Sequence, residues 1–409
     1  MIIQNEWSYK IAHFKKCDSI ENMTQLKMTS TIATQPLWNK SAAAESQKQK
    51  KQQRKTTPKE AITMKALVLE EKDKLQIRDI EINEYLSATD VRIKIAKVGI
   101  CGSDVHYYQH GRIGDFVVNA PMILGHEASG IIVEVGSAVQ HLRIGDRVCM
   151  EPGVFEPNSP EAMQGLYHLD PNIQFWATPP VHGVLRESGV HPANLTFKLP
   201  DHVSLEEAVL VEPLSSGVHV ARKVGISPGD TAVVTGAGTI GALMALALLA
   251  SGCSRVIITD VKQQKLDFLV QHYGERLIAC NVAQEDLKCF VQRHFVGGVD
   301  LFVDCSGHAS AIAAAPDCLK PAGKLVFVGM PQHAVLMDIV AMQVKEIETI
   351  SIFRYANDYE RSIALIASGQ INVKPLISKK IHFNQSIQAF ELAASAPPDV
   401  IKIIIDFDL

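Results

Sequence analysis

The chain has 409 residues, 47% of them hydrophobic and 21% charged, which excludes a wholly disordered or fibrous protein and allows two domains. The formal net charge of −4 provides no electrostatic basis for binding nucleic acid. The most apolar stretch, residues 240–250, is about half as long as a membrane-spanning helix, so we expect no membrane partner.

The first part of the chain differs in composition from the rest. Residues 1–63 carry 11 Lys and Arg against 5 Asp and Glu, and residues 40–59 are polar and basic. The apolar segment of a secretory signal is missing there, and the acidic residues argue against a transit peptide. We expect residues 1–63 to be a disordered, dispensable basic extension, and the first clear strand to begin at Met64.

Residues 64 to about 150 are rich in β-strand patterns. Apolar runs with many β-branched residues predict strands at 65–70, 90–100, 129–136 and 147–152. Residues 153–195 are rich in Pro, Gly, Asn and His, and this composition predicts long loops.

After residue 212 the pattern changes to strands that alternate with helices. We predict strands at 231–236, 255–260, 276–280, 300–307, 323–330 and 348–353. The intervening helices are expected at 239–251, 262–274, 284–295 and 309–319. This alternation is typical of crossover connections and a parallel sheet. Residues 358–409 predict a helix, strands, a second helix and a last strand at 400–407.

A glycine-rich motif, GxGxxG, lies between the first of these strands and the first helix. Gly236 permits the tight turn, Gly238 lets the main chain approach a pyrophosphate, and Gly241 lets the helix pack on the strand. Thr239 and Ile240 open the helix, whose free N–H groups favour an anion. The motif therefore predicts a dinucleotide-binding site.

Two further residues bear on which dinucleotide binds. Asp260 ends the next predicted strand, and a carboxylate there accepts both ribose hydroxyls and repels a 2′-phosphate, so we expect NAD rather than NADP. The alternative is that Asp260 only caps the following helix. Lys265, one helical turn further, is either a ribose contact or a solvated helix lysine.

Three residues combine a thiolate, an imidazole and a carboxylate: Cys101, His126 and Glu127. This set suits Zn²⁺, and three protein ligands leave a position open for a substrate. The alternative is that they are ordinary core or surface residues. The eight cysteines include no CxxC pair and indicate a reducing compartment.

From about Met64 onward the chain resembles the zinc-containing medium-chain alcohol dehydrogenases. The resemblance rests on GICGSD at 99–104, GHEASG at 125–130, Gly136 and the GxGxxG motif. Further segments resemble the sorbitol and xylitol dehydrogenases, namely 103–107, 111–116, 151–153, 177–180, 211–215 and 353–357. The segment 175–183 looks most like bacterial xylitol dehydrogenases (D-xylulose reductases).

The resemblance implies an α/β fold with two domains. A GroES-like, β-rich catalytic domain would occupy 64–214 and return at 355–409. An NAD-binding Rossmann domain, a doubly wound parallel sheet, would occupy 215–354. Because the family pairs its Rossmann sheets edge to edge, a homodimer or homotetramer is expected. The expected location is the cytoplasm, in line with the reducing compartment that the cysteines indicate.

It also implies one catalytic zinc per chain on Cys101, His126 and Glu127, with Glu212 binding the metal directly or through its water. Many relatives hold a structural zinc on four cysteines in the loop after the strand predicted at 147–152. Since that loop contains no cysteine here, we expect no structural zinc.

Among the neighbours of this set, Ser103 and His106 resemble the family's proton relay, although both also suit ordinary turn and helix-start roles. Asp104 is either an N-cap or a group that orients a zinc ligand. Four residues resemble positions that face the substrate, with a surface ion pair or a packed ring as the alternative: Tyr107, Phe175, Arg354 and Tyr355.

The implied reaction is the oxidation of a polyol by NAD, with xylitol converted to D-xylulose preferred. Zinc lowers the pKa of the alcohol, and the hydride passes to the nicotinamide. Sorbitol (L-iditol), L-arabinitol and L-idonate are alternative substrates. A different class, a structural or nucleic-acid-binding member with reduced chemistry, is favoured only by the basic extension, and the intact metal set argues against it.

Overall fold

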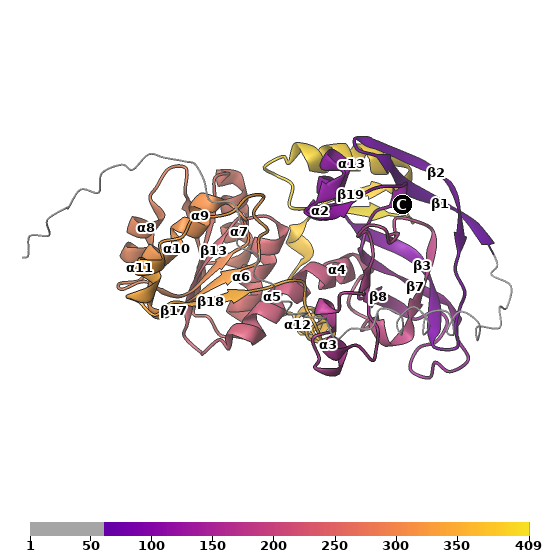
Figure 1. Cartoon of the computed structure of the whole chain (residues 1–409), viewed down its shortest axis with the longest axis horizontal. Coiled ribbons are helices and arrows are strands. Elements are labelled where there is room, and N and C mark those ends of the chain that lie inside the picture. Colours follow the sequence, from indigo (N-terminus) through magenta and orange to yellow (C-terminus); the bar gives the residue numbers. More distant parts are fainter. Residues whose placement is uncertain (1–60, 409) are drawn as a thin grey trace, which may run out of the picture. The chain divides into compact units, whose positions relative to one another are not determined.

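The computed structural model describes residues 61–408 (Figure 1), so the basic run at 40–59 lies outside the described residues. Strand β1 (Ala61–Glu71) begins three residues before the predicted start of the first strand and pairs along its length with β2 (Lys74–Asn83). Residues 61–63 therefore belong to a hairpin and not to the basic extension.

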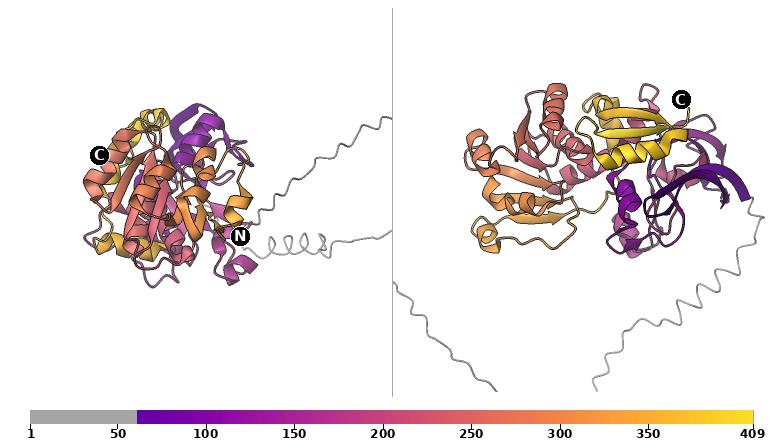
Figure 2. Two further views of the ribbon diagram at one scale, coloured as in Figure 1. Left: turned by 90° about the vertical axis from the view of Figure 1, so that its left-hand side faces the viewer. Right: turned by 90° about the horizontal axis from the view of Figure 1, so that it is seen from above.

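The first and last parts of the described chain form one β-rich domain. Its main sheet has seven strands: β3 (Asp90–Gly99), β7 (Glu127–Val135), β8 (Arg147–Met150), β11 (Ser188–Pro192), β12 (Thr196–Lys198), β19 (Ile377–His382) and β20 (Lys402–Asp406). The late strand β20 pairs antiparallel with the early strand β3. Figure 2 shows the C-terminal elements beside the first strands, and α13 (Ser386–Ser395) contacts β2.

The intervening chain forms a six-stranded, wholly parallel sheet in the order β15-β14-β13-β16-β17-β18. Its strands are β13 (Thr231–Thr235), β14 (Arg255–Asp260), β15 (Leu277–Asn281), β16 (Val299–Asp304), β17 (Leu319–Phe327) and β18 (Glu348–Ser351). The order reverses direction between β13 and β16, which is the point where doubly wound sheets bind dinucleotides. The predicted fold class, GroES-like plus Rossmann, is confirmed.

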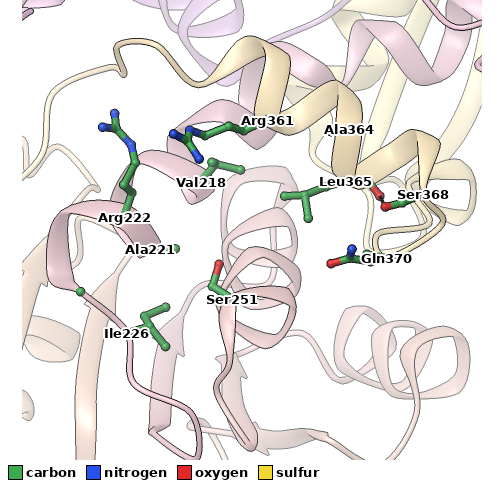
Figure 3. A pocket seen from close by; sticks show the side chains of 11 residues that line it. Val218, Ala221, Arg222, Ile226, Ser251, Arg361, Ala364, Leu365, Ser368 and Gln370 are labelled. Atoms are coloured by element: carbon green, nitrogen blue, oxygen red, sulfur yellow. Dashed lines mark hydrogen bonds between the residues drawn. The ribbon is translucent and has the colours of Figure 1, made fainter.

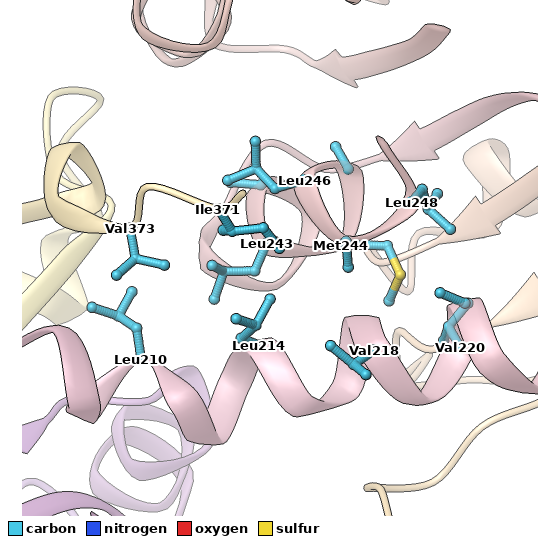
Figure 4. Close-up of a cluster of buried hydrophobic side chains, with 14 of the residues drawn as sticks. Leu210, Leu214, Val218, Val220, Leu243, Met244, Leu246, Leu248, Ile371 and Val373 are labelled. Atoms are coloured by element: carbon cyan, nitrogen blue, oxygen red, sulfur yellow. The ribbon is translucent and has the colours of Figure 1, made fainter. Parts of the chain in front are cut away.

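Helices cover this sheet, and the largest core cluster includes the contact between α5 (Val211–Val224) and α6 (Thr239–Ser251) (Figure 4). Leu214 and Val218 of α5 lie against Leu243 and Met244 of α6 in that figure. A β-carbon on Gly217 would lie 2.9 Å from the Ala247 β-carbon, so this glycine allows the two helices to approach closely.

Most predicted strands and helices of the parallel-sheet region have the predicted type and lie within a few residues of the predicted bounds. The helix predicted at 309–319 is divided at Ala314 into α9 (Ala309–Ala313) and α10 (Ala315–Cys318). Pro316 explains the division, because proline has no N–H to continue α9 and fits the first turn of α10. The remaining helices are α2 (Gly102–His110), α3 (Pro160–Met163), α4 (Leu205–Val209), α7 (Gln263–Tyr273), α8 (Leu287–His294), α11 (Ile339–Gln343) and α12 (Tyr359–Ala367).

Residues 153–195 are mostly loops, as predicted. Residues 188–192, however, form strand β11, which pairs antiparallel with β3. None of the helices within residues 61–408 is both long and apolar enough to cross a bilayer.

Candidate active site

Cys101, His126 and Glu127 lie together at one end of the seven-stranded sheet. Each offers one ligand atom, and these three atoms lie within 4.8 Å of one another. The strand register explains the meeting, because Glu127 begins β7 directly opposite Gly99 of β3, two residues before Cys101. Within residues 61–408 no other group of three or more possible ligands was found.

Asp104 connects the two loops that carry Cys101 and His126. Its wholly buried carboxylate accepts the Cys101 N–H (3.1 Å) and the Gly125 N–H (3.0 Å), and it lies 3.6 Å from the His126 Nδ1. The N-cap of α2 is Cys101, so the N-cap alternative for Asp104 is wrong. Asp104 is the third residue of the helix, closes its capping box and also faces the imidazole, as expected of a group that orients a zinc ligand.

Glu127 has a partner that the sequence analysis missed. Lys402 Nζ lies 2.9 and 2.7 Å from the two Glu127 carboxylate oxygens and donates to the Ile100 carbonyl at 3.0 Å. Both side chains are almost fully buried, and a β-carbon on Gly99 would clash with the carboxylate. Burial alone would lower the pKa of Lys402, but Glu127, Cys101 and Glu212 together raise it above its ordinary value, so the lysine is charged. One sign of this buried partner is present in the sequence, because Lys402 is a single lysine within the largely apolar run 400–407.

A cavity of about 290 Å³ opens in front of the possible metal ligands. Its lining includes Cys101, Ser103, Tyr107, His126, Phe175, Glu212, Ile240, Arg354 and Tyr355. The structure therefore brings together nearly all the residues predicted to face metal or substrate. His106 is not among the lining residues; its Nδ1 lies 2.9 Å from the Arg112 carbonyl oxygen.

Glu212 lies in the first turn of α5 and faces this cavity, but it is not part of the three-ligand cluster. Its Oε1 accepts a 2.6 Å hydrogen bond from the Tyr355 hydroxyl. Burial raises the pKa of Glu212 above its ordinary value. The arrangement suits either a distant metal ligand or a group that acts through water.

Part of the cavity wall is aromatic and cationic. The Arg354 guanidinium lies 4.0 Å from the centroid of the Phe175 ring, and the Phe175 and His126 rings are 5.7 Å apart. Tyr107 is buried, and burial together with the Asp104 charge raises its pKa to about 12. Its hydroxyl is therefore a neutral donor or acceptor at physiological pH.

A second cavity shares lining residues with this one, and a third cavity shares a lining residue with the second. A cavity of about 300 Å³ is lined by the glycine-rich turn, Lys265 and Lys402, and it shares Cys101 and Ile240 with the cavity at the metal ligands. A cavity of about 540 Å³ shares Gly236 with the cavity of about 300 Å³ and is lined in part by Asp260. The series fits a long ligand such as a dinucleotide, with its nicotinamide end beside the metal ligands.

The glycine-rich turn has the geometry that its sequence predicts. Gly236 is left-handed (φ 89°), Gly238 caps α6, and a β-carbon on Gly241 would clash with the Gly236 carbonyl. The Thr239 hydroxyl donates to the Ile401 carbonyl (2.7 Å), which ties the turn to the strand that carries Lys402.

Asp260 is fixed by main-chain groups, since its carboxylate oxygens accept the Ala237 N–H (2.8 Å) and the Lys262 N–H (2.9 Å). No side chain caps α7, so the alternative that Asp260 caps this helix is not supported. Lys265 lines the adjoining cavity, and burial lowers its pKa.

Comparison with known proteins agrees with this geometry. The family description "Alcohol dehydrogenase GroES-like domain" matches residues 87–201, and "Zinc-binding dehydrogenase" matches residues 239–368. The chain is 52% identical over 333 residues to a D-xylulose reductase of Morganella morganii, covering 81% of this chain and 98% of that protein. It is 40% identical over 310 residues to a sorbitol dehydrogenase of Arabidopsis thaliana, covering 75% and 85% respectively.

Among solved structures, an oxidoreductase/dehydrogenase of Escherichia coli is similar with a TM-score of 0.80 and 32% identity, covering 84% of this chain and 99% of that chain. The chain therefore belongs to the zinc-containing medium-chain alcohol dehydrogenase family, in the branch that contains the sorbitol dehydrogenases and D-xylulose reductases.

Proposed function

We propose that this protein is an NAD-dependent polyol dehydrogenase that preferentially oxidises xylitol to D-xylulose. One observation carries the proposal. The three metal-ligand side chains converge, Cys101 and His126 line the cavity that has Arg354 on its wall, and Glu127 lines the adjoining cavity at the glycine-rich turn. The 52% identity to the Morganella morganii D-xylulose reductase supports xylitol as the substrate.

The donor set fits one catalytic Zn²⁺, held by Cys101, His126 and Glu127, with Glu212 as the variable fourth group. When bound, zinc polarises the alcohol oxygen and lowers its pKa. The loop after β8 contains no cysteine. This supports one catalytic zinc per chain and no structural zinc.

Each remaining side chain at the site has a proposed task. Ser103 lines the cavity and would take the alcohol proton first, and His106 of the same helix would pass it to solvent. Arg354 and Tyr355, with Tyr107, would bind the additional hydroxyls, and Phe175 would exclude water and hold the Arg354 guanidinium.

NAD rather than NADP is proposed because Asp260 ends β14 in the cavity next to the glycine-rich turn, where its carboxylate would accept the ribose hydroxyls and repel a 2′-phosphate. The edge strand β18 and exposed apolar residues near it, including Leu336, Val340 and Val344, support a homodimer or homotetramer that pairs these edges. A cytoplasmic location follows from the proposed chemistry and the unpaired cysteines in the described part of the chain.

The test is a set of initial rates with xylitol, sorbitol, L-arabinitol and L-idonate, each with NAD and with NADP, on protein whose zinc content has been measured. We expect about one zinc per chain, and the highest kcat/KM with xylitol and NAD. The sorbitol dehydrogenase relative makes sorbitol the second candidate, and a higher kcat/KM with sorbitol would select it. Less than about half an equivalent of zinc, with no turnover, would favour a non-enzymatic role.

A further inference from the structure

The segment 353–358, named here the Arg354 loop, lies between strand β18 and helix α12 and carries three residues of the cavity wall, Phe353, Arg354 and Tyr355. Arg354 (φ 56°) and Asn357 (φ 60°) both have left-handed backbone conformations. Residues other than glycine adopt this conformation at a cost, and they keep it only where the surroundings hold them. Contacts outside the loop must therefore fix its shape.

An ion pair between a buried carboxylate and a partly exposed arginine supplies such contacts at the end of the loop. The Asp358 carboxylate is wholly buried and accepts hydrogen bonds from Arg222 Nε (3.0 Å), Arg222 Nη2 (3.2 Å) and His219 Nδ1 (2.9 Å). Arg222 Nη2 also donates to the Ala356 carbonyl at 2.7 Å. One guanidinium thus holds both a side chain and the main chain of the Arg354 loop.

Arg222 connects the loop to helix α5, which also carries the cavity residue Glu212. It lies in the last turn of α5, and Glu212, which accepts the Tyr355 hydroxyl, lies in the first turn of the same helix. The Arg354 loop is therefore held to α5 at two places, on both sides of Ala356. Arg222 is 43% exposed, toward a surface pocket of about 580 Å³ that also contains Arg361 (Figure 3).

We propose that Asp358 and Arg222 are positioning residues for polyol recognition: their ion pair fixes the Arg354 loop so that Arg354 and Tyr355 face the substrate. The proposal deepens the proposed polyol dehydrogenase function and rests on it. Neither residue lines the cavity at the metal ligands, so neither contacts the substrate directly.

The test compares Asp358→Asn and Arg222→Ala with Asp406→Asn. Asp406 is an equally buried aspartate that pairs with Lys97 (2.5 Å) in the seven-stranded sheet, away from the loop. We expect the KM for the preferred polyol to rise about tenfold in the first two variants, as the loss of one positioned substrate contact predicts. The zinc content and the Kd for NADH should remain unchanged, because the metal and dinucleotide sites are intact. The kcat should change by less than about threefold. Asp406→Asn should leave all four quantities at the wild-type values.

Chemical rescue separates positioning from general damage. The Arg222 side chain reaches the surface pocket, so guanidinium at about 10 mM should enter the space left by Arg222→Ala and restore much of the polyol KM. Should Asp358→Asn fail to fold, the double variant Asp358→Leu/Arg222→Met removes both charges, is expected to fold, and should show the same KM.

Two results would overturn the proposal: a wild-type KM in folded Arg222→Ala, or an equal rise in Asp406→Asn. If the wild-type protein oxidises no polyol, the proposed function fails and the positioning claim is judged by a crystal structure of Asp358→Asn. Displacement of the Arg354 guanidinium from the Phe175 ring would support it, and an unchanged loop would refute it.

Discussion

At the scale of single residues, the Glu127–Lys402 pair has the largest electrostatic consequence. Two charges with side-chain exposures of 1% and 2% lie together, so each depends on the other for compensation. Removal of one partner leaves an uncompensated buried charge, which is far more costly than the loss of an exposed pair.

We therefore expect Lys402→Met to lower the free energy of unfolding of the metal-free protein by about 3–5 kcal/mol. Lys380→Met is the matched control, because Lys380 pairs with Glu206 at the surface (3.5 Å) and should matter by at most about 1 kcal/mol. Urea unfolding measures both variants. Similar losses for the two lysines would contradict the interpretation of the buried pair.

Gly99 provides a second residue-scale prediction. A methyl group there would meet the Glu127 carboxylate and the Val209 side chain, so Gly99→Ala should displace Glu127 and weaken zinc binding by about tenfold or more. Gly102→Ala is the control, because a β-carbon on Gly102 meets nothing within 4 Å. Competition with a chromogenic chelator gives the affinities, and equal affinities in the two variants would refute this prediction.

The residues that could be predicted from sequence are those whose chemistry is carried by short motifs, such as Cys101, His126 and the glycines of the turn. Lys402 and Asp358 could not be found in this way. Their partners, Glu127 and Arg222, lie 275 and 136 residues away in the chain, and only the strand register and the packing of α12 on α5 bring them together.

At the scale of elements, α5 is a helix that the sequence analysis did not predict. Its sequence contains Pro213, Ser215, Ser216 and Gly217, which favour turns in isolation. Pro213 is tolerated because it lies in the first helical turn, where its missing N–H has no partner to lose. The remaining helical free energy comes from burial against α6, a tertiary effect that no local pattern records.

The close contact of α5 with α6 is testable at Gly217. The added methyl group of Gly217→Ala would lie 2.9 Å from the Ala247 β-carbon and 3.2 Å from the Leu243 carbonyl oxygen. We expect a loss of about 1–3 kcal/mol in the free energy of unfolding, although alanine is the better helix former. A stability equal to or above that of the wild type, measured by urea unfolding, would mean that the helices separate without cost.

At the scale of the whole molecule, buried histidines predict how stability depends on pH. Burial lowers the pKa of His191 from 6.5 to about 3, and its Nε2 lies 2.9 Å from the Glu151 carbonyl oxygen. Between these values the unfolded chain binds a proton that the folded chain does not bind. Stability from this residue is therefore complete above pH 6.5 and is lost toward pH 3.

His191→Gln keeps a donor for the Glu151 carbonyl but does not titrate. We expect the variant to be no more stable than the wild type at pH 7.5, and to gain about 1.4 kcal/mol relative to it for each pH unit below 6.5. Urea unfolding at pH 4.5–7.5 gives the difference. Parallel pH profiles would show that His191 is protonated in the folded protein.

The whole-molecule architecture followed from the sequence more fully than the site did, because the alternation of strands and helices and the glycine-rich turn are local signals repeated along the chain. The composition of residues 61–63 gave no sign that they pair with β2. Their pairing depends on a partner strand, and so the start of the folded region was placed slightly late.

The antiparallel pairing of β20 with β3 has a consequence for biosynthesis. Ribosomes produce the thiol, the imidazole and the carboxylate hundreds of residues before they produce the ammonium group that neutralises that carboxylate. The chain order places the whole parallel sheet before β19 and β20, so during translation its strands are all made while the seven-stranded sheet still lacks two of its own. A nascent chain that bound a metal ion before β20 paired with β3 would hold it without the Lys402 ammonium group beside Glu127, so we expect the finished metal site to form only after this last pairing.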